Sequence, residues 1–580
     1  MTPIANPPAD EKTEAAGVVK EYGPAAEGKP SGRTPTENPE APATPTSPSG
    51  IRLIFSRLLA CLAGSLNGRR GLPLQKVTRS DTETTSHAEA LKSTSIIGGS
   101  TVIVMLIRML RTKVLALLLG PGGIGLEAIY DSVVTLSKTA VDLGISSSGV
   151  RQIAAAVGSG SRPVIATTVY TLRRVCLVLG IIGATTLFLS REAVSRLAFG
   201  NADHASDIGL LSIILLFGAV MGGQGALLQG MRRIGDLAKM NMFGALAGAL
   251  LSIPIVYVWG RAGIPAYMVL AAGVGVFVSW SYARRVRIEP VKVPVRQIAS
   301  EASSLLKLGL VFLSTGLMTT GALFLLRVFV TRQEGVYGAG QFQAANALAM
   351  VYVGFVLQAM GTDFYPRLTA VAGDNRKCNQ LVNEQAEISI LLALPGVLAT
   401  LALAPWVIQI FYSNKFDKAA EILCWQVTGT FLQVNSWPMG FILLAKGRAA
   451  ALFWTDLASY SLYVLLGWVS LKLFGLPGTG IAYLGLYIFH WCVVYAIARR
   501  ISGFTLSPVN IRLSLLGVGT VAVAFGARLM LPGLWATFIG CTLAVATGFY
   551  TMRTLIGLVG KDKIDRQMRK LGLSFLLPKH

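Results

Sequence analysis

Apolar stretches of about 20 to 30 residues recur along this chain from residue 95 onward, separated by short polar segments. An α-helix of that length crosses the hydrocarbon core of a bilayer, so each stretch predicts one transmembrane helix. We predict fourteen spans, at approximately 95–119, 125–156, 164–190, 207–230, 237–259, 264–283, 303–330, 338–364, 386–411, 418–444, 449–473, 479–498, 509–531 and 534–557.

The segments outside the spans are polar or only weakly apolar. Residues 1–90 predict a disordered tail, because Pro, Ala, Ser, Thr and Glu dominate its first part and cannot bury enough surface to order it. Within it, residues 51–66 are apolar but short, and a small or polar stripe predicts an amphipathic helix in the membrane plane. Residues 558–580 predict a basic cytoplasmic tail.

A basic loop with two prolines divides the spans into groups. Residues 286–302 predict a cytoplasmic linker between a six-helix bundle at 91–285 and a second at 303–500. Short segments after the second and eighth spans are weakly similar, which favours a parallel repeat. Two additional helices at 507–557 lie outside that repeat. The fold class predicted is therefore all-α and polytopic, with about fourteen helices.

Composition and charge agree with a membrane protein. Hydrophobic residues make up 53% of the chain and charged residues 14%. The net charge of +23 comes from Lys and Arg in alternate short loops, so it predicts topology with both termini cytoplasmic, and no nucleic-acid partner. The six cysteines show no CxxC spacing, so no disulfide framework or metal site is predicted.

The second span carries four ionisable residues, Glu127, Asp131, Lys138 and Asp142. At about 100° per residue they fall within roughly 60° of one another on a helix. Each such charge costs about 2.5 to 3.5 kcal/mol on insertion scales, so this charged stripe should face a water-filled cavity or opposite charges. Transport is the first functional hypothesis.

Two arginines of the first span, Arg108 and Arg111, lie about 60° apart on one helix face near mid-membrane. Guanidinium groups there need anions. A substrate pyrophosphate would suit the planar fork of donors. The alternative is structural pairing with Glu127 and Asp131.

Arg327 is the matching cation of the seventh span, the equivalent helix of the second half. It predicts a third pyrophosphate-binding group in a shared cavity. An arginine that snorkels to the membrane surface is the alternative.

Polar residues of later spans suggest two further sites. Gln426, Gln433 and Trp437 share one face of the tenth span, where amides and an indole would contact a glycan, although the same stripe would also hold helices together. Pro366 should end the eighth span, with Asp363 and Arg367 four residues apart as a pair at the cytoplasmic mouth or gate; a purely structural helix stop is the alternative.

The sequence gives little support for an enzymatic function. A membrane glycosyltransferase or polymerase needs a sizeable outer loop, but the longest predicted here covers residues 191–206 and carries no acidic pair of the DxD kind. No Walker A pattern is present. We therefore expect a transporter, not an enzyme, without a cofactor or metal.

Several longer motifs resemble one family, the Wzx-type O-antigen translocases of the multidrug, oligosaccharidyl-lipid and polysaccharide exporter superfamily. They are LKSTSIIGGS (91–100), RTKVLALLLGPGGIG (111–125), DLGISSSGVRQIA (142–154), LQAMGTDFYPRLTAVAGDN (357–375), NEQAEISILLALPGVLATLALAP (383–405) and SWPMGFILLAKGR (436–448). The resemblance covers about residues 90 to 500. It implies two six-helix transmembrane bundles around a central cavity, in the bacterial inner membrane.

By the same resemblance, the chain is expected to be a flippase. It would export an undecaprenyl-pyrophosphate-linked oligosaccharide to the periplasmic leaflet by alternating access, as a monomer, with the polymerase and chain-length proteins of its pathway as partners. Coupling to a proton, a sodium ion or the membrane potential stays open. The alternatives are an ion-coupled drug exporter and, because of the fourteen spans, a lipid II flippase of the same superfamily.

Overall fold

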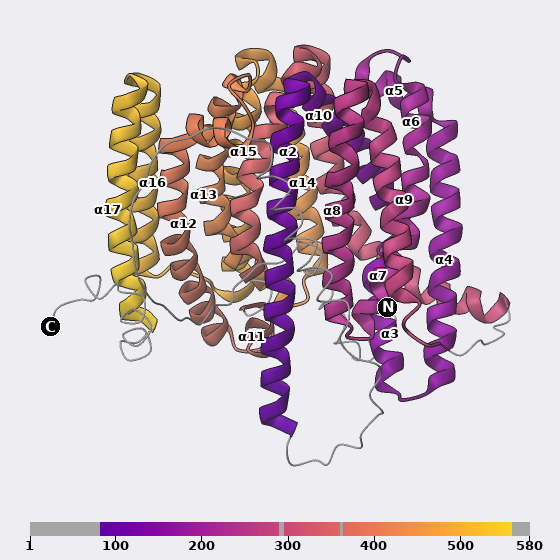
Figure 1. Cartoon of the computed structure of the whole chain (residues 1–580). Helices are drawn as coiled ribbons and strands as arrows, with labels where there is room; N and C mark the ends of the chain where they lie inside the picture. Colours follow the sequence, from indigo (N-terminus) through magenta and orange to yellow (C-terminus); the bar gives the residue numbers. More distant parts are fainter. Residues whose placement is uncertain (1–81, 289–294, 360–363, 560–580) are drawn as a thin grey trace, which may run out of the picture. The chain divides into compact units, whose positions relative to one another are not determined.

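The computed structural model describes residues 82–288, 295–359 and 364–559, and the helices discussed below belong to the compact unit that begins at Ile96. The predicted helix at 51–66, Asp363, and most of the basic tail at 558–580 lie outside the described residues. The described part is helical throughout its length, with short connections (Figure 1). This confirms the predicted all-α class.

The helices follow one another as α2 (Thr82–Asp142), α3 (Ile145–Gly158), α4 (Arg162–Leu189), α5 (Arg191–Phe199), α6 (Ala205–Leu211), α7 (Ile213–Gly230), α8 (Ile234–Trp259), the 3-10 turn η2 (Gly260–Ala262), α9 (Gly263–Ala283), α10 (Val295–Ala359), α11 (Tyr365–Ala370), α12 (Asn375–Phe411), α13 (Asp417–Ala445), α14 (Ala449–Phe474), α15 (Pro477–Ser502), α16 (Pro508–Met530) and α17 (Gly533–Val559).

Two of these helices are sharply kinked. Gly120 in α2 and Gly335 in α10 have φ values of 65° and 70°, a backbone region that favours glycine, and each kink divides its helix into two membrane-length parts. Divided there, with α6 and α7 taken as one span, α3 counted with the second part of α2, and the short α5 and α11 left out, the described helices match the fourteen predicted spans.

The boundaries differ from the prediction at several places, since α10 and α12 begin at Val295 and Asn375, ahead of the predicted starts at 303 and 386. Helix α2 begins at Thr82, so residues 82–90 are helical, although we predicted a tail there. The predicted span 125–156 is interrupted at Leu143 and Gly144, whose φ values are 47° and 70°. These left-handed residues end α2 and begin α3, a break that hydrophobic periodicity does not reveal.

Backbone bends recur at a fixed interval of the chain. Adding 215 to residue numbers 120, 232 and 260, all of positive φ, gives 335, 447 and 475, also of positive φ. The pairs are Gly120 with Gly335, Arg232 with Gly447, and Gly260 with Gly475. Two halves of the chain thus repeat one sequence of bends, as parallel repeats of a transporter would. The bundle boundaries at 91–285 and 303–500 stay predictions.

The two kinked helices touch through their backbones next to the kinks. A Cβ atom on Gly125 would lie 1.9 Å from the carbonyl oxygen of Val336, and one on Gly340 would lie 1.9 Å from that of Pro121. These two contacts are related by the same interval of 215, so each half supplies one glycine and one carbonyl. Only glycine permits so close an approach.

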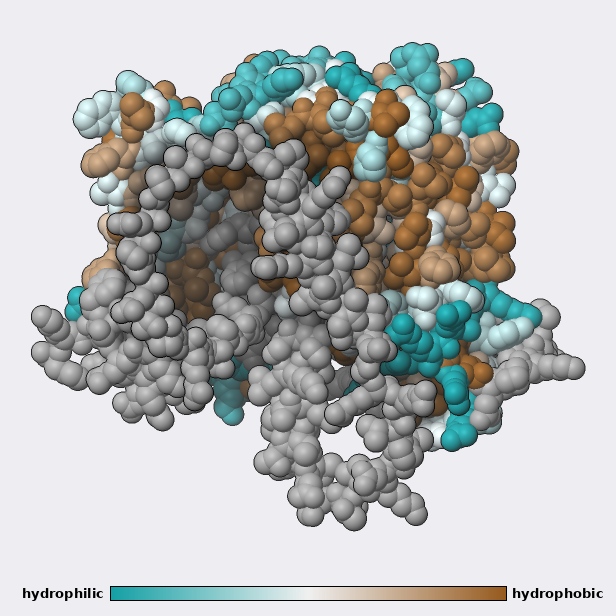
Figure 2. All heavy atoms as spheres, in the orientation of Figure 1, coloured by the Kyte–Doolittle hydropathy of each residue, from teal (hydrophilic) through white to brown (hydrophobic). Residues whose placement is uncertain are grey.

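Apolar side chains cover the outside of the helices. Figure 2 shows hydrophobic residues in a band between hydrophilic residues above and below it. Nine described segments are long and apolar enough to cross a membrane by length and composition. At the edge of the molecule, α16 and α17 pack against α12 (Figure 1), so the two additional helices extend the second half.

Candidate functional site

The charged stripe predicted on the second span is the accessible face of its helix. Asp131, Thr135 and Lys138 are exposed, whereas the intervening Ser132 to Val134 are buried. Asp142, at the end of the stripe, is half-buried and accepts a hydrogen bond of 2.5 Å from the Ser146 hydroxyl. Asp131 and Lys138 make no ion pair or hydrogen bond within the described residues, so their charges are available to a ligand.

Arg108 is also exposed, and it points away from the membrane-facing side of α2. The exposed Leu106 and Leu110 each lie about 160° from it around the helix. Since those leucines suit lipid contact and a guanidinium does not, Arg108 faces the interior side. It has no hydrogen-bond or ion-pair partner within the described part of the chain.

Arg111 has a different environment, in a network that joins three helices. Its guanidinium donates to Glu127 Oε1 at 2.5 Å, to the Tyr267 hydroxyl at 2.9 Å and to Ser252 Oγ at 3.1 Å. The Tyr267 ring also lies 5.1 Å below the guanidinium carbon. Arg111 and Glu127 therefore form a half-buried structural pair that holds α8 and α9 against both parts of α2. This pairing is the structural alternative that the sequence left open, and pyrophosphate binding by Arg111 stays a prediction.

Arg327 occupies a comparable place in α10. It donates to Gln343 Oε1 at 2.5 Å, across the Gly335 kink, and to the carbonyl of Ala128 in α2 at 3.1 Å. Like Arg111 and Glu127, Arg327 and Gln343 are 16 residues apart. The acceptor here is a neutral amide, and Nε of Arg327 has no partner. The side chain is 6% exposed, so it does not snorkel to a surface.

The charge on Arg327 is therefore incompletely balanced. Within the described residues it contacts no carboxylate, although Asp131 is near enough to interact electrostatically. A buried cation without a paired anion is costly, and it would be stabilised by an anionic ligand on the Asp131 face. The structure thus brings Arg327 close to Asp131 of the charged stripe but places it behind the exposed surface, and its binding of pyrophosphate stays a prediction.

Replacing Gln343, the side-chain acceptor of Arg327, by glutamate should raise stability and lower transport. We expect Gln343→Glu to raise the thermal unfolding midpoint, because a charge-assisted hydrogen bond is roughly twice as strong as a neutral one. Gln343→Ala should lower the midpoint by leaving a buried donor unsatisfied. If Arg327 attracts an anionic substrate, Gln343→Glu should also reduce transport. Equal midpoints for both variants in detergent would contradict this account.

The predicted glycan contacts are not accessible in this structure. Gln426 and Gln433 are 0% and 3% exposed, and Trp437 is half-buried in a cluster of apolar side chains. Gln433 accepts a hydrogen bond of 2.7 Å from the Tyr483 hydroxyl of α15. The stripe therefore joins α13 to α15, which is the alternative role of holding helices together. Direct contact of these side chains with sugar is not supported here.

Two of the predicted mouth residues, Pro366 and Arg367, lie in the short helix α11. Pro366 stands in its first turn, where its missing N–H costs nothing. Arg367 is exposed and engaged in an interaction, and Phe364 packs edge-on against Phe441 at 5.6 Å between ring centroids. The gate role stays a prediction.

Three residues of the site escaped sequence analysis. Ser252 and Tyr267 complete the Arg111 network, but an isolated Ser or Tyr in an apolar span carries no distinctive pattern. Asp456 could have been found, since it is a carboxylate within the predicted eleventh span. It accepts a hydrogen bond of 3.3 Å from the Thr315 hydroxyl of α10. Among the described residues, no group of three or more His, Cys, Asp or Glu could hold a metal.

Comparison with known proteins identifies a family model that matches this chain. Residues 114–421 match the model of a family described as "Polysaccharide biosynthesis protein". Over 433 residues the chain is 23% identical to proteins named lipid III flippase in Escherichia coli strain K12 and in Shigella flexneri. Each alignment covers 69% of this chain and 97% of the relative.

Solved structures with a similar fold are also transporters. The "Lipid II flippase MurJ, inward closed conformation" has a TM-score of 0.63 at 11% identity, and the match covers 79% of this chain and 98% of that one. An inward-facing multidrug resistance MATE family transporter of the MOP superfamily has a TM-score of 0.60 at 16% identity, covering 69% and 94%. At these identities the similarity establishes the fold alone.

Proposed function

The chain belongs to the family of polysaccharide biosynthesis proteins, and from this we propose that it is a flippase for an undecaprenyl-pyrophosphate-linked oligosaccharide. It would move this lipid from the cytoplasmic to the periplasmic leaflet of the bacterial inner membrane by alternating access between its two halves. The family match agrees with the resemblance that the motifs predict, and the lipid III flippases among its relatives support a lipid-linked sugar as substrate.

The observation that carries the proposal is the set of exposed charges on α2 that have no ion-pair partner in the described part of the chain. Arg108 and Lys138 are cationic and Asp131 is anionic, so the accessible site is net positive. A pyrophosphate crossing an apolar core needs such groups in place of water. An exporter of organic cations would need the opposite balance, which argues against the drug-exporter alternative.

The orientation follows from the same proposal. With both termini cytoplasmic, the kinked regions where α2 and α10 touch, at Gly125 and Gly340, face the periplasm. Those backbone contacts would keep the periplasmic side shut while the site loads from the cytoplasm. Alternating access then requires them to separate in each cycle.

Arg108→Ala should reduce glycan export at least about tenfold, since a charge-assisted hydrogen bond contributes roughly 1.5 to 3 kcal/mol. Arg108→Lys should retain part of the activity, because charge remains while the bidentate fork is lost. Arg553→Ala, an equal charge change on exposed α17, is the matched control and should export normally. Export would be measured as periplasmic glycan per molecule of folded protein. Full export by Arg108→Ala would remove the main support for the proposal.

A further inference from the structure

A second basic site lies at the C-terminal end of α9, near Asp142 at the end of the charged stripe. It is a cavity of about 560 Å³ between α4, α7 and α9. Its lining includes Arg173 of α4, Gln224 of α7, Trp280 of α9, and Arg284 and Arg287 just after α9. Among the described residues, no carboxylate contributes to the lining.

The three arginines of this pocket are exposed and unpaired within the described residues. The guanidinium of Arg284 lies 4.8 Å from the centre of the Trp280 ring, which holds it at the pocket edge by a cation–π contact. Gln224 is 7% exposed, and its amide oxygen accepts a hydrogen bond from the Ser279 hydroxyl. That bond leaves the amide N–H₂ of Gln224 as a further donor. Every polar group so placed favours an anion.

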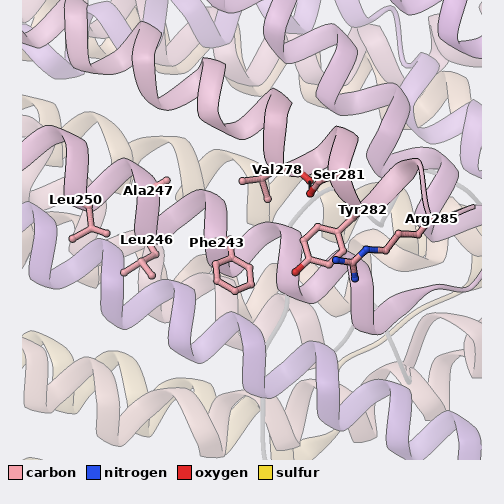
Figure 3. A pocket seen from close by; sticks show the side chains of 8 residues that line it. All are labelled: Phe243, Leu246, Ala247, Leu250, Val278, Ser281, Tyr282 and Arg285. Atoms are coloured by element: carbon pink, nitrogen blue, oxygen red, sulfur yellow. Dashed lines mark hydrogen bonds between the residues drawn. The ribbon is translucent and has the colours of Figure 1, made fainter. Parts of the chain in front are cut away.

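The neighbouring Arg285 shows that these features belong to the pocket and not to the basic segment as a whole. It lies on the opposite face of α9, where its guanidinium stacks on the Tyr282 ring at 4.4 Å and approaches Asp236 Oδ1 at 3.9 Å. Figure 3 shows it at one end of a mainly apolar groove between α8 and α9. Arg285 thus already has an aromatic and an acidic partner.

We propose that the pocket formed by Arg173, Gln224, Trp280, Arg284 and Arg287 binds the phosphate headgroup of an anionic membrane lipid. Guanidinium forks match phosphate oxygens, and basic pockets between transmembrane helices are typical headgroup sites. Leu177, at 45% exposed, and Trp280, at 47%, give the pocket an apolar side along which an acyl chain can lie. The leaflet is the one at the C-terminal end of α9, the cytoplasmic leaflet in the proposed orientation.

The test compares lipids retained by the whole protein after extraction from membranes containing phosphatidylglycerol and phosphatidylcholine. Native mass spectrometry should detect one retained phosphatidylglycerol on the unmodified protein. The variant Arg173→Gln with Arg284→Gln should lose most of it, by about tenfold or more for two charge-assisted contacts. Arg285→Gln, the same charge change on the opposite face of α9, should retain it. The double variant Arg173→Lys with Arg284→Lys keeps both charges. It controls for loss of bound phosphatidylglycerol that is caused by misfolding.

The outcomes separate lipid from free phosphate. Displacement of phosphatidylglycerol by millimolar inorganic phosphate would mean that the site recognises only the phosphate group. That result would overturn the lipid assignment. Equal retention by the Arg173→Gln, Arg284→Gln variant and by Arg285→Gln would overturn the site itself. Because the readout is bound lipid and not glycan export, its failure is distinct from failure of the proposed transport function.

Discussion

Replacing Arg111 with alanine is expected to destabilise the protein by about 3 kcal/mol, the lower end of the cost of removing one partner of a buried ion pair, because this pair is half-buried. Glu127, at 20% side-chain exposure, would keep its charge but lose its guanidinium, and Tyr267 and Ser252 would lose their donor. Chemical unfolding in detergent, followed by tryptophan fluorescence, measures the change. The effect belongs to Arg111 and not to Arg108, because Arg108 has no hydrogen-bond or ion-pair partner among the residues that the structure describes.

The double variant Arg111→Ala with Glu127→Gln distinguishes the pair from a simple packing loss. It should recover part of the lost stability, since no unpaired charge remains. An unfolding free energy of Arg111→Ala equal to that of the unmodified protein would show that the pair is only a surface contact. Export by Arg111→Ala, normalised to folded protein, then tells whether Arg111 also serves the substrate.

The second large effect is expected at the glycine contacts between α2 and α10. Gly340→Ala would place a methyl group 1.9 Å from the carbonyl oxygen of Pro121, and Gly125→Ala would do the same at Val336. Both neighbours are backbone atoms next to kinks, so the helices must move apart. We expect each variant to shift the protein toward the state that is open at this end, with export falling about tenfold or more as the cycle loses its closed state.

Gly244→Ala is the control for these substitutions, because a Cβ atom there meets nothing within 4 Å. The opening can be followed by the distance between one spin label on α5 and one at the C-terminal end of α12, which lies near the kink of α2. Longer distances in Gly125→Ala and Gly340→Ala, but not in Gly244→Ala, are predicted. Unchanged distances together with full export would show that the contacts are not part of a gate.

Sequence analysis located the charged stripe because ionisable residues are rare in an apolar span and their spacing puts them on one helix face. It could not assign separate roles to Arg108 and Arg111, which lie on nearly the same face. Their roles depend on the angle across the Gly120 kink, which brings Glu127 back to Arg111. That angle is set by tertiary contacts and leaves no periodic signal.

The amide stripe of α13 illustrates a different limit. Periodicity correctly indicates that Gln426 and Gln433 share one face, but not whether a cavity or another helix covers it. Tyr483 of α15 covers Gln433 in the structure. The sequence also could not predict the glycine contact between the two halves. The pattern GPGGIG is typical of a loop, and only the structure shows that it packs against α10.

Leaflet-resolved transport in vesicles tests the central claim most directly. Purified protein would be reconstituted with a fluorescent undecaprenyl-pyrophosphate oligosaccharide, and the fraction accessible to a membrane-impermeant reagent would be followed with time. The account predicts transfer between leaflets by the unmodified protein and its loss in Arg108→Ala, with no competition from an organic cation. No transfer of any pyrophosphate-linked glycan, or transfer that an organic cation inhibits and Arg108→Ala leaves intact, would contradict it.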